Sequence, residues 1–317
     1  MLCHWDEVPE QRVDAGHLRG RWTDLGSAAG TVSVGLRRVR LAPGDQSTPA
    51  HLHDAEEEIC FVLSGEGLSW QDGATYEVRA GDVLAHPPAG AAHTLVAGSD
   101  GLEVLMFGER RIAEVSVLPR VGIGWIGAGT WTDVGAPPHP FEREAAAGPV
   151  ELPPPSARPR SIAAVDAAEP ESISRGETAM AVRRIGPRIG CRQTGVRTVA
   201  IEPGALGCPP HCHSAEEELF VVLEGEGTLL LGDARREDWT APAPGDHAVY
   251  AGHVISRPAG TGVAHAFRAG PDGLVLLGFG RRDSNDMAWY PRSSKVTMRG
   301  LGVTFRVTEV AYWDGEA

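Results

Sequence analysis

Residues 211–227 decide the fold of this chain, and they read HCHSAEEELFVVLEGEG. Residues 51–67, which lie 160 positions earlier, read HLHDAEEEICFVLSGEG. The two segments share 11 of 17 residues, including both histidines, all three glutamates and both glycines. Because identity this dense at one fixed offset indicates an internal duplication, the chain is predicted to contain two copies of one structural unit.

The length and composition agree with two globular domains. A chain of 317 residues favours two domains of roughly 150 residues. Its 40 glycines and 24 prolines favour short strands and tight turns over long helices. The formal net charge of −13 argues against nucleic acid or an anionic membrane as a partner, since both attract basic surfaces. The expected partner is a small molecule, and a homodimer is left open.

The cysteines and the first residues favour a reducing compartment. The five cysteines are odd in number and scattered, so they do not suggest a disulfide framework. The first residues lack the basic start and apolar run of a signal peptide. No segment reaches the roughly 18 apolar residues of a membrane span. A cytoplasmic location is therefore predicted.

The duplication also sets the predicted domain division. An N-terminal unit with its preamble is expected over residues 1–135, and a C-terminal unit over residues 161–317. The segment between them, residues 136–160, is rich in proline and alanine and is predicted to be an extended linker. The end of the chain, with Phe305 and Trp313, is expected to add one more strand that packs back on the second unit.

Strand-like alternation dominates both copies, and no long amphipathic helix is evident, so the fold class is predicted to be all-β. Residues 35–41 alternate and stop at a Pro-Gly pair, as do residues 195–201. The glycine-rich segments around Gly65 and Gly225 are predicted to be turns between apolar strands.

The first copy places three histidines and a glutamate at a spacing that suits a metal ion. Residues two apart in a strand share a face, so His51 and His53 can bind one ion. Alternation with the apolar residues that follow selects Glu58 from the run of three glutamates. His93, about forty residues further on, supplies a third imidazole.

The second copy repeats the whole set with His211, His213, Glu218 and His265. Three imidazoles and one carboxylate suit a divalent transition metal such as Fe, Mn, Ni, Cu or Zn, one in each unit. Such a set leaves positions open for water or substrate, unlike a structural zinc site closed by four ligands. The remaining glutamates of the two runs are expected to form solvated acidic turns: Glu56, Glu57, Glu216 and Glu217.

On these residues the chain resembles the cupin superfamily, in the two-domain form called a bicupin. The first cupin motif is matched from Gly44 to Gly65 and from Gly204 to Gly225, with one extra residue before the first histidine. The second motif is matched from Gly81 to His93. It is looser from Gly252 to His265, where the histidine lies two residues late, and neither copy has the final asparagine.

The resemblance implies two double-stranded β-helix barrels of the jelly-roll type in tandem, each with a metal in its mouth. The metal pattern is closer to oxalate decarboxylase and quercetinase than to three-histidine cupins of the gentisate type. It implies a metal-dependent enzyme acting on a small oxygenated molecule. Glu58 and Glu218 are the candidate catalytic residues, because the resemblance permits such a glutamate to leave the metal and act as a base.

The reaction class is left open between several hypotheses. A dioxygenase-type oxidoreductase is the leading hypothesis. Decarboxylase, isomerase or lyase chemistry at the same site is the alternative. A non-catalytic bicupin that binds a small ligand is the competing class.

Several further residues have two interpretations each. Cys60 and Phe220 occupy the same inward position, two residues after each metal glutamate, and either shape the two pockets or pack in the core. Arg38 and Arg40 either face a cavity or are solvated. His86 and Arg257 precede the Pro-x-Gly turns of the second motifs and could line a pocket mouth. The histidines without partners at ligand spacing are expected on the surface: His4, His17, His139, His247 and His253.

Overall fold

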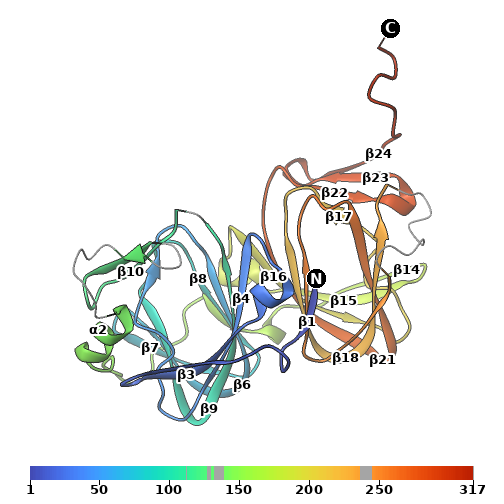
Figure 1. Cartoon of the computed structure of the whole chain (residues 1–317). Coiled ribbons are helices and arrows are strands. Elements are labelled where there is room, and N and C mark those ends of the chain that lie inside the picture. Colours follow the sequence, from blue (N-terminus) through green and yellow to red (C-terminus); the bar gives the residue numbers. More distant parts are fainter. Residues whose placement is uncertain (112, 127–129, 132–138, 236–244, 317) are drawn as a thin grey trace.

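The computed structural model describes residues 1–111, 113–126, 130–131, 139–235 and 245–316, and most of its regular structure is strand (Figure 1). Each copy combines an eight-stranded antiparallel sheet with a four-stranded sheet. The predicted all-β class with two tandem jelly-roll-like units is confirmed. The sheets follow open strand orders rather than a closed ring.

The first copy is built from two sheets. The strands of its large sheet are β13 (Ile162–Ala164), β8 (Asp82–His86), β6 (Glu58–Gln71), β9 (His93–Glu109), β4 (Val34–Leu41), β3 (Leu18–Asp24) and β2 (Gln11–Ala15), with β7 (Ala74–Arg79) paired to β6. The strands of its small sheet are β12 (Thr130–Trp131), β11 (Ile123–Ile126), β10 (Val115–Leu118) and β5 (Leu52–His53).

The second copy repeats this arrangement. The strands of its large sheet are β1 (Leu2–His4), β20 (His253–Arg257), β18 (Glu218–Asp233), β21 (Val263–Arg281), β16 (Thr194–Ile201), β15 (Thr178–Arg184) and β14 (Glu171–Arg175), with β19 (His247–Tyr250) paired to β18. The strands of its small sheet are β17 (Cys212–His213), β22 (Met287–Tyr290), β23 (Lys295–Met298) and β24 (Val303–Arg306).

The helices are short. They are α1 (Leu25–Ala29), α2 (Pro140–Ala147), α3 (Gly186–Ile189) and the 3₁₀ turns η1 (Val165–Ala167), η2 (Pro291–Ser293) and η3 (Arg299–Leu301). No helix in the described residues has the length and apolar character to cross a bilayer. All five cysteines lie in the described part of the chain, and none forms a disulfide.

Two short strands cross the predicted division between the units. Strand β1 pairs with β20 of the second copy, with Leu2 opposite Ile255. Strand β13 pairs with β8 of the first copy, with Ile162 opposite Leu84. The boundaries at residues 135 and 161 stay predictions, and each large sheet carries an edge strand from beyond its own boundary.

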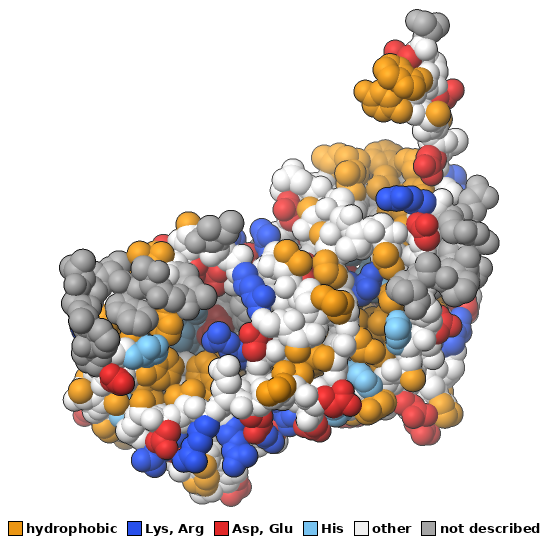
Figure 2. Space-filling model, viewed as in Figure 1, with side chains coloured by type: hydrophobic (Ala, Val, Ile, Leu, Met, Phe, Trp, Pro, Cys, Tyr) orange, Lys and Arg blue, Asp and Glu red, His pale blue; other side chains and the backbone are white. Residues whose placement is uncertain are grey.

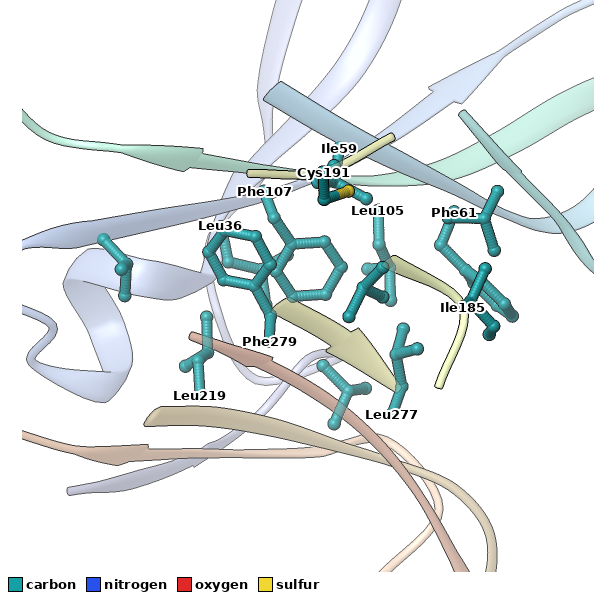
Figure 3. Close-up of a cluster of buried hydrophobic side chains, with 14 of the residues drawn as sticks. Leu36, Ile59, Phe61, Leu105, Phe107, Ile185, Cys191, Leu219, Leu277 and Phe279 are labelled. Carbon is teal, nitrogen blue, oxygen red and sulfur yellow. The ribbon is translucent and has the colours of Figure 1, made fainter. Parts of the chain in front are cut away.

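A hydrophobic core joins the two copies face to face (Figure 3). Strand β6 alternates, so Ile59 and Phe61 point toward the second copy while Cys60 and Val62 point into their own unit. At the centre the rings of Phe107 and Phe279 stack with centroids 4.9 Å apart. Both large sheets are therefore apolar on both faces, which explains their continuous apolar runs.

The glycine-rich segments are not turns, and that prediction was wrong. Strand β6 continues through Gly65 and Gly67 with two register shifts against β9. Gly65 has a φ of +79°, and a Cβ there would lie 2.1 Å from the carbonyl oxygen of Gly101. The glycines thus permit β-bulges that bend one long strand, and Gly225 does the same in β18.

The segment between the copies is not simply extended, which corrects the linker prediction. Helix α2 forms there because His139 and Glu142 make a capping box and Pro140 starts the first turn. The following chain lies along the first copy, where Trp70 Nε1 donates to the carbonyl of Glu151 (3.0 Å). Residues 136–138 of the predicted linker lie outside the described residues.

The predicted additional strand is present and pairs with the second unit, but the residues beyond it do not pack back. Strand β24 pairs with β23 at a sheet edge, but Phe305 remains 48% exposed. Beyond it the chain leaves the body of the protein, and Figure 2 shows hydrophobic side chains on this projecting segment. Tyr312 and Trp313 are 86% and 74% exposed. The aromatic residues predicted a segment that packs on the protein, but Tyr312 and Trp313 remain exposed.

Candidate metal centres

The N-terminal centre gathers the four predicted residues of the first copy. One donor atom from each of His51, His53, Glu58 and His93 lies within 4.8 Å of the others. His93 Nε2 lies 2.9 Å from Glu58 Oε2, and His53 Nε2 lies 3.9 Å from Glu58 Oε1. Strands β5, β6 and β9 and the residue before β5 therefore bring together side chains separated by up to 42 positions.

The C-terminal centre is arranged around one carboxylate oxygen, and three of its four predicted residues form one group. The Nε2 atoms of His265, His213 and His211 lie 3.1, 3.4 and 3.6 Å from one atom, Glu218 Oε2. His211, Glu218 and His265 form one compact group, whereas His213 approaches it through Glu218. The late position of His265 in the sequence motif does not keep its imidazole from the centre.

A second carboxylate holds the second histidine of each pair. His53 Nδ1 lies 2.9 Å from Glu114 Oε1, and His213 Nδ1 lies 2.7 Å from Asp286 Oδ2. In both copies the first histidine is held instead by a backbone carbonyl two residues earlier (2.9 Å). These contacts on Nδ1 turn Nε2 toward the centre, as in metal sites where a carboxylate orients a histidine ligand.

The residues present fit a transition metal ion. The Nε2 atoms of His53, His213 and His265, together with Glu218 Oε2, are buried and make no hydrogen bond with the described residues. Buried polar atoms are normally paired, so three unpaired atoms at the C-terminal centre and one at the N-terminal centre indicate a ligand at each. Imidazole and carboxylate donors suit the divalent metals named above.

The protonation states of the candidate ligands suit a cation. Burial lowers the pKa of His51 and of His265 to about 3, which leaves both imidazoles neutral near pH 7. Burial opposes ionisation of Glu58 and Glu218, but the surrounding histidines outweigh it and hold both pKa values below their usual range. Burial also acts against a charged His213, but the hydrogen bonds of this residue to carboxylates raise its pKa to about 10.

Glu57 and Glu217 are not solvated, which corrects the prediction for the acidic runs. Alternation turns both side chains toward the other copy, where they are 1% and 2% exposed. Glu217 accepts hydrogen bonds from the amides of Val32 and Ser33 (3.0 and 2.6 Å) and from two hydroxyls. Glu57 accepts from the amide and hydroxyl of Thr194 and from one more amide of the second copy.

The outer glutamates of the runs are held as well. Glu216 is 3% exposed and accepts from the amide of Asp283 (2.8 Å). Glu56 is half-buried and accepts from the amide of Arg111. None of the four is therefore a free acidic turn, because the runs pack against the segments that follow β9 and β21.

A cavity of about 650 Å³ opens onto the N-terminal centre. Its wall includes the metal-centre residues His51, His53 and Glu58. An aromatic side is formed by Trp22, Trp125 and Phe141, and Phe141 comes from helix α2 of the linker. The rings of Trp22 and Phe141 lie edge to face with centroids 6.3 Å apart. The cavity therefore combines a polar floor with an aromatic wall.

The arginines of the cavity wall are not those considered from the sequence. Arg38 pairs with Glu103 and Asp6 on the outer face, and Arg40 pairs with Glu10. The cavity is lined instead by Arg37, Arg110 and Arg111.

A sequence signal for Arg37 existed, since arginine also stands 160 residues later. Arg197 borders the C-terminal centre and donates from Nη2 to Glu218 Oε1 (2.6 Å). In the first copy Arg37 alternates with the inward-facing Val39 and Leu41, which places it on the inner face of β4.

The orienting carboxylates were also missed from the sequence. Glu114 and Asp286 lie 61 and 73 residues after the histidines that they hold. Both stand four residues after the arginine that ends the Phe-Gly-x-Arg segment of their copy. An acidic residue at the same offset in both copies was the available signal.

The remaining predicted positions divide between the centres and the core. The ring of His86 stacks on His93 with centroids 3.7 Å apart, and the equivalent Arg257 is buried and bonded to a backbone carbonyl. The ring of Phe220 lies 5.8 Å from that of His265, whereas Cys60 packs within the core of the first copy. Of the expected surface histidines, His4, His17, His139 and His247 are exposed or partly exposed, but His253 is 8% exposed because β1 covers it.

Two curated relatives match parts of the chain. A dimethylsulfoniopropionate lyase of Ruegeria pomeroyi is 36% identical over 87 residues, which cover 27% of this chain and 55% of the relative. An oxalate-binding protein of Thermotoga maritima is 36% identical over 69 residues, which cover 22% of this chain and 55% of the relative. The chain thus matches about half the length of each.

Solved structures with the same fold include oxalate decarboxylases. One from Bacillus subtilis has a TM-score of 0.57 and 15% identity, covering 89% of this chain and 77% of its own. One from Lactobacillus farciminis has a TM-score of 0.58 and 14% identity, covering 89% and 86%. At this identity the likeness shows the fold alone.

The family comparison agrees with the duplication and with the two centres. The cupin domain family matches residues 37–107 and again residues 197–273. Each match contains all four candidate ligands of its copy. The chain therefore carries two cupin domains and belongs to the cupin superfamily as a bicupin.

Proposed function

We propose that this bicupin is a metal-dependent enzyme that cleaves a bond in a small carboxylate, in the manner of a decarboxylase or lyase, at its N-terminal centre. The observation that carries the proposal is the cavity of about 650 Å³ that opens onto His51, His53 and Glu58. The relatives support the substrate class. One is named for oxalate, another for dimethylsulfoniopropionate, and the structural neighbours for oxalate decarboxylation, and all of these molecules carry a carboxylate.

Each centre would hold one divalent metal through three histidines and one glutamate. The N-terminal ligands would be His51, His53, Glu58 and His93, and the C-terminal ligands would be His211, His213, Glu218 and His265. Manganese is a leading candidate among the predicted metals, since one neighbouring oxalate decarboxylase is described with Mn(II) centres. The cytoplasmic location and the homodimer stay predictions.

The chain's own residues would divide the work at the N-terminal centre. A bound metal would act as a Lewis acid that polarises the oxygen atoms of the substrate. Glu114 fixes the imidazole of His53, so that Nε2 keeps its direction. Glu58 has no arginine partner among the described residues, so its carboxylate is the candidate to accept a substrate proton at Oε1. Glu218 is less suited, because Arg197 occupies its Oε1.

The cavity favours a substrate larger than oxalate. Its volume lies in the range of pockets that bind drug-sized ligands, roughly 300–1,000 Å³. A two-carbon acid would fill only a small part of it. The aromatic side formed by Trp22, Trp125 and Phe141 suits a carboxylate that carries an apolar or conjugated group.

The same aromatic side favours a second candidate function. Dioxygenases of this fold class that act on aromatic or flavonol substrates would use such a wall for stacking. Dioxygenase chemistry differs from decarboxylation and lyase chemistry in consuming O₂ stoichiometrically with substrate.

An activity screen tests the proposed function. Metal-loaded protein is incubated with 2-oxo acids, aromatic carboxylates and sulfonium carboxylates, with catechols and flavonols as a second group. Product release without O₂ uptake is expected from the first group. Turnover of the second group with equal O₂ uptake would instead support the dioxygenase. Metal-loaded protein that binds ligands of both groups without converting any would contradict both enzymes.

The orienting carboxylates supply a second prediction. Asp286→Asn is expected to lower metal affinity at the C-terminal centre by about 10- to 100-fold, because His213 loses the charge that fixes its ring. Glu114→Gln is expected to do the same at the N-terminal centre. The measurement is a Mn²⁺ titration by calorimetry, in which each variant retains one unaffected site. The exposed Asp272→Asn is the control, and two unchanged sites in Asp286→Asn would contradict the assignment.

A further inference from the structure

We propose that Arg37 is an anion-binding residue of the N-terminal cavity and binds the carboxylate of the substrate beside the metal centre. The inference rests on the proposed function and deepens it, since it names the group that would select a carboxylate. It also distinguishes the two centres, because the equivalent arginine of the second copy is already occupied.

The strand register places Arg37 beside the centre. Arg37 lies opposite Met106 on β9, and Met106 lies opposite Cys60 on β6, two residues from Glu58. Side chains directly opposite on neighbouring strands share a face and lie about 5 Å apart. Arg37 therefore projects from the same inner face as Glu58.

The second copy demonstrates the reach of an arginine at this position. Arg197 occupies the equivalent place on β16, and its Nη2 lies 2.6 Å from Glu218 Oε1. Arg197 lies over Gly278, where an added Cβ would be in van der Waals contact with Arg197 Cγ at 3.4 Å and Cζ at 3.5 Å. A longer side chain at this position would occupy the space that the arginine fills.

The first copy differs at that neighbouring position. Met106 stands where the second copy has Gly278, and it packs against the core of the first copy. Arg37 does not bond Glu58 and instead lies over the ring of Trp22, with Cζ 5.5 Å from the ring centroid. Its guanidinium makes no hydrogen bond or ion pair with the described residues.

The other charged groups of the cavity wall are already paired. Arg110 contacts Asp24 (3.7 Å) and Ser27, and Arg111 binds Glu109 (3.1 Å). Asp24 lies opposite Arg37 on β3, but its carboxylate accepts from Ser27 and faces Arg110, and it forms no ion pair with Arg37. Arg37 is therefore the cavity arginine whose five N–H donors remain available to a carboxylate.

Calorimetric titration of the Mn²⁺-loaded protein with phenylpyruvate tests the role of Arg37. The methyl ester of the same acid is the uncharged probe. Arg37→Gln is expected to weaken phenylpyruvate binding by about 10- to 100-fold and to leave ester binding unchanged, because only the acid offers a charged acceptor. Arg37→Lys is expected to recover part of the affinity. The matched control is Arg40→Gln on the outer face of the same strand, where Arg40 pairs with Glu10, and it is expected to leave phenylpyruvate binding unchanged.

The outcomes separate the two proposals. Wild-type protein that binds phenylpyruvate, with Arg37→Gln binding it equally well, would overturn the role of Arg37 and leave the proposed function standing. An equal loss for acid and ester in Arg37→Gln would also overturn it, since that loss would reflect the shape of the cavity. Wild-type protein that binds none of phenylpyruvate, benzoate and oxalate would overturn the carboxylate class itself, and with it this inference.

Discussion

Glu58→Gln is expected to lower kcat for the substrate found in the activity screen by about 10²- to 10⁴-fold, the usual contribution of a general base. Glutamine retains the shape of the side chain and one oxygen ligand but cannot accept a proton. The three histidines of the N-terminal centre remain, so metal is still bound when Mn²⁺ is supplied in excess. The measurement is kcat at saturating substrate together with the metal content of the same sample.

Glu218→Gln is the matched control, since it makes the same change at the equivalent position of the second copy. It is expected to change kcat by less than about tenfold. Its Oε1 already accepts from Arg197, and its Oε2 lies 3.1 Å from His265 Nε2. A result in which Glu218→Gln loses activity and Glu58→Gln retains it would place the reaction at the C-terminal centre and contradict the proposal.

Glu217→Ala is expected to destabilise the protein by about 3–5 kcal/mol, which is a large part of a typical folding free energy. The substitution removes the acceptor of two amides and two hydroxyls, in hydrogen bonds that are buried or partly buried at the contact between the copies. Each donor left buried without a partner costs about 1–3 kcal/mol. Urea unfolding followed by circular dichroism measures the change.

Glu224→Ala lies on the same strand and is the control, because this glutamate is exposed to solvent. It is expected to change the free energy of unfolding by no more than about 0.5 kcal/mol. Glu57→Ala, which removes the reciprocal contact, is expected to resemble Glu217→Ala. Equal stability of Glu217→Ala and Glu224→Ala would contradict the importance of these contacts.

The fold and the ligand sets followed from the duplication and from strand alternation. A period of two selected Glu58 from three glutamates, and the structure turns that side chain inward with Cys60 and Val62. The same period should have turned Glu57 outward together with Ile59 and Phe61. An apolar outer face indicates a second layer of protein, and that signal was present in the run from Ile59 to Leu63.

Other features could not be read from one chain because they depend on distant contacts. Glu114 and Asp286 act through histidines more than sixty residues away. Arg37 and Arg197 have different partners, and the residues opposite them on the neighbouring strand differ as well. Met106 lies opposite Arg37, and Gly278 lies opposite Arg197. Helix α2 was not predicted because the prolines of its segment favoured an extended chain. The sequence did contain its capping residues, His139 and Glu142.

The central claim is that each copy holds one metal through its own four residues. Metal analysis of protein saturated with Mn²⁺ and then desalted tests it most directly. We expect about two ions per chain for the wild type, about one each for His51→Ala and His211→Ala, and almost none for the double variant. A folded wild-type protein without metal, or a double variant that retains as much metal as the wild type, would contradict it.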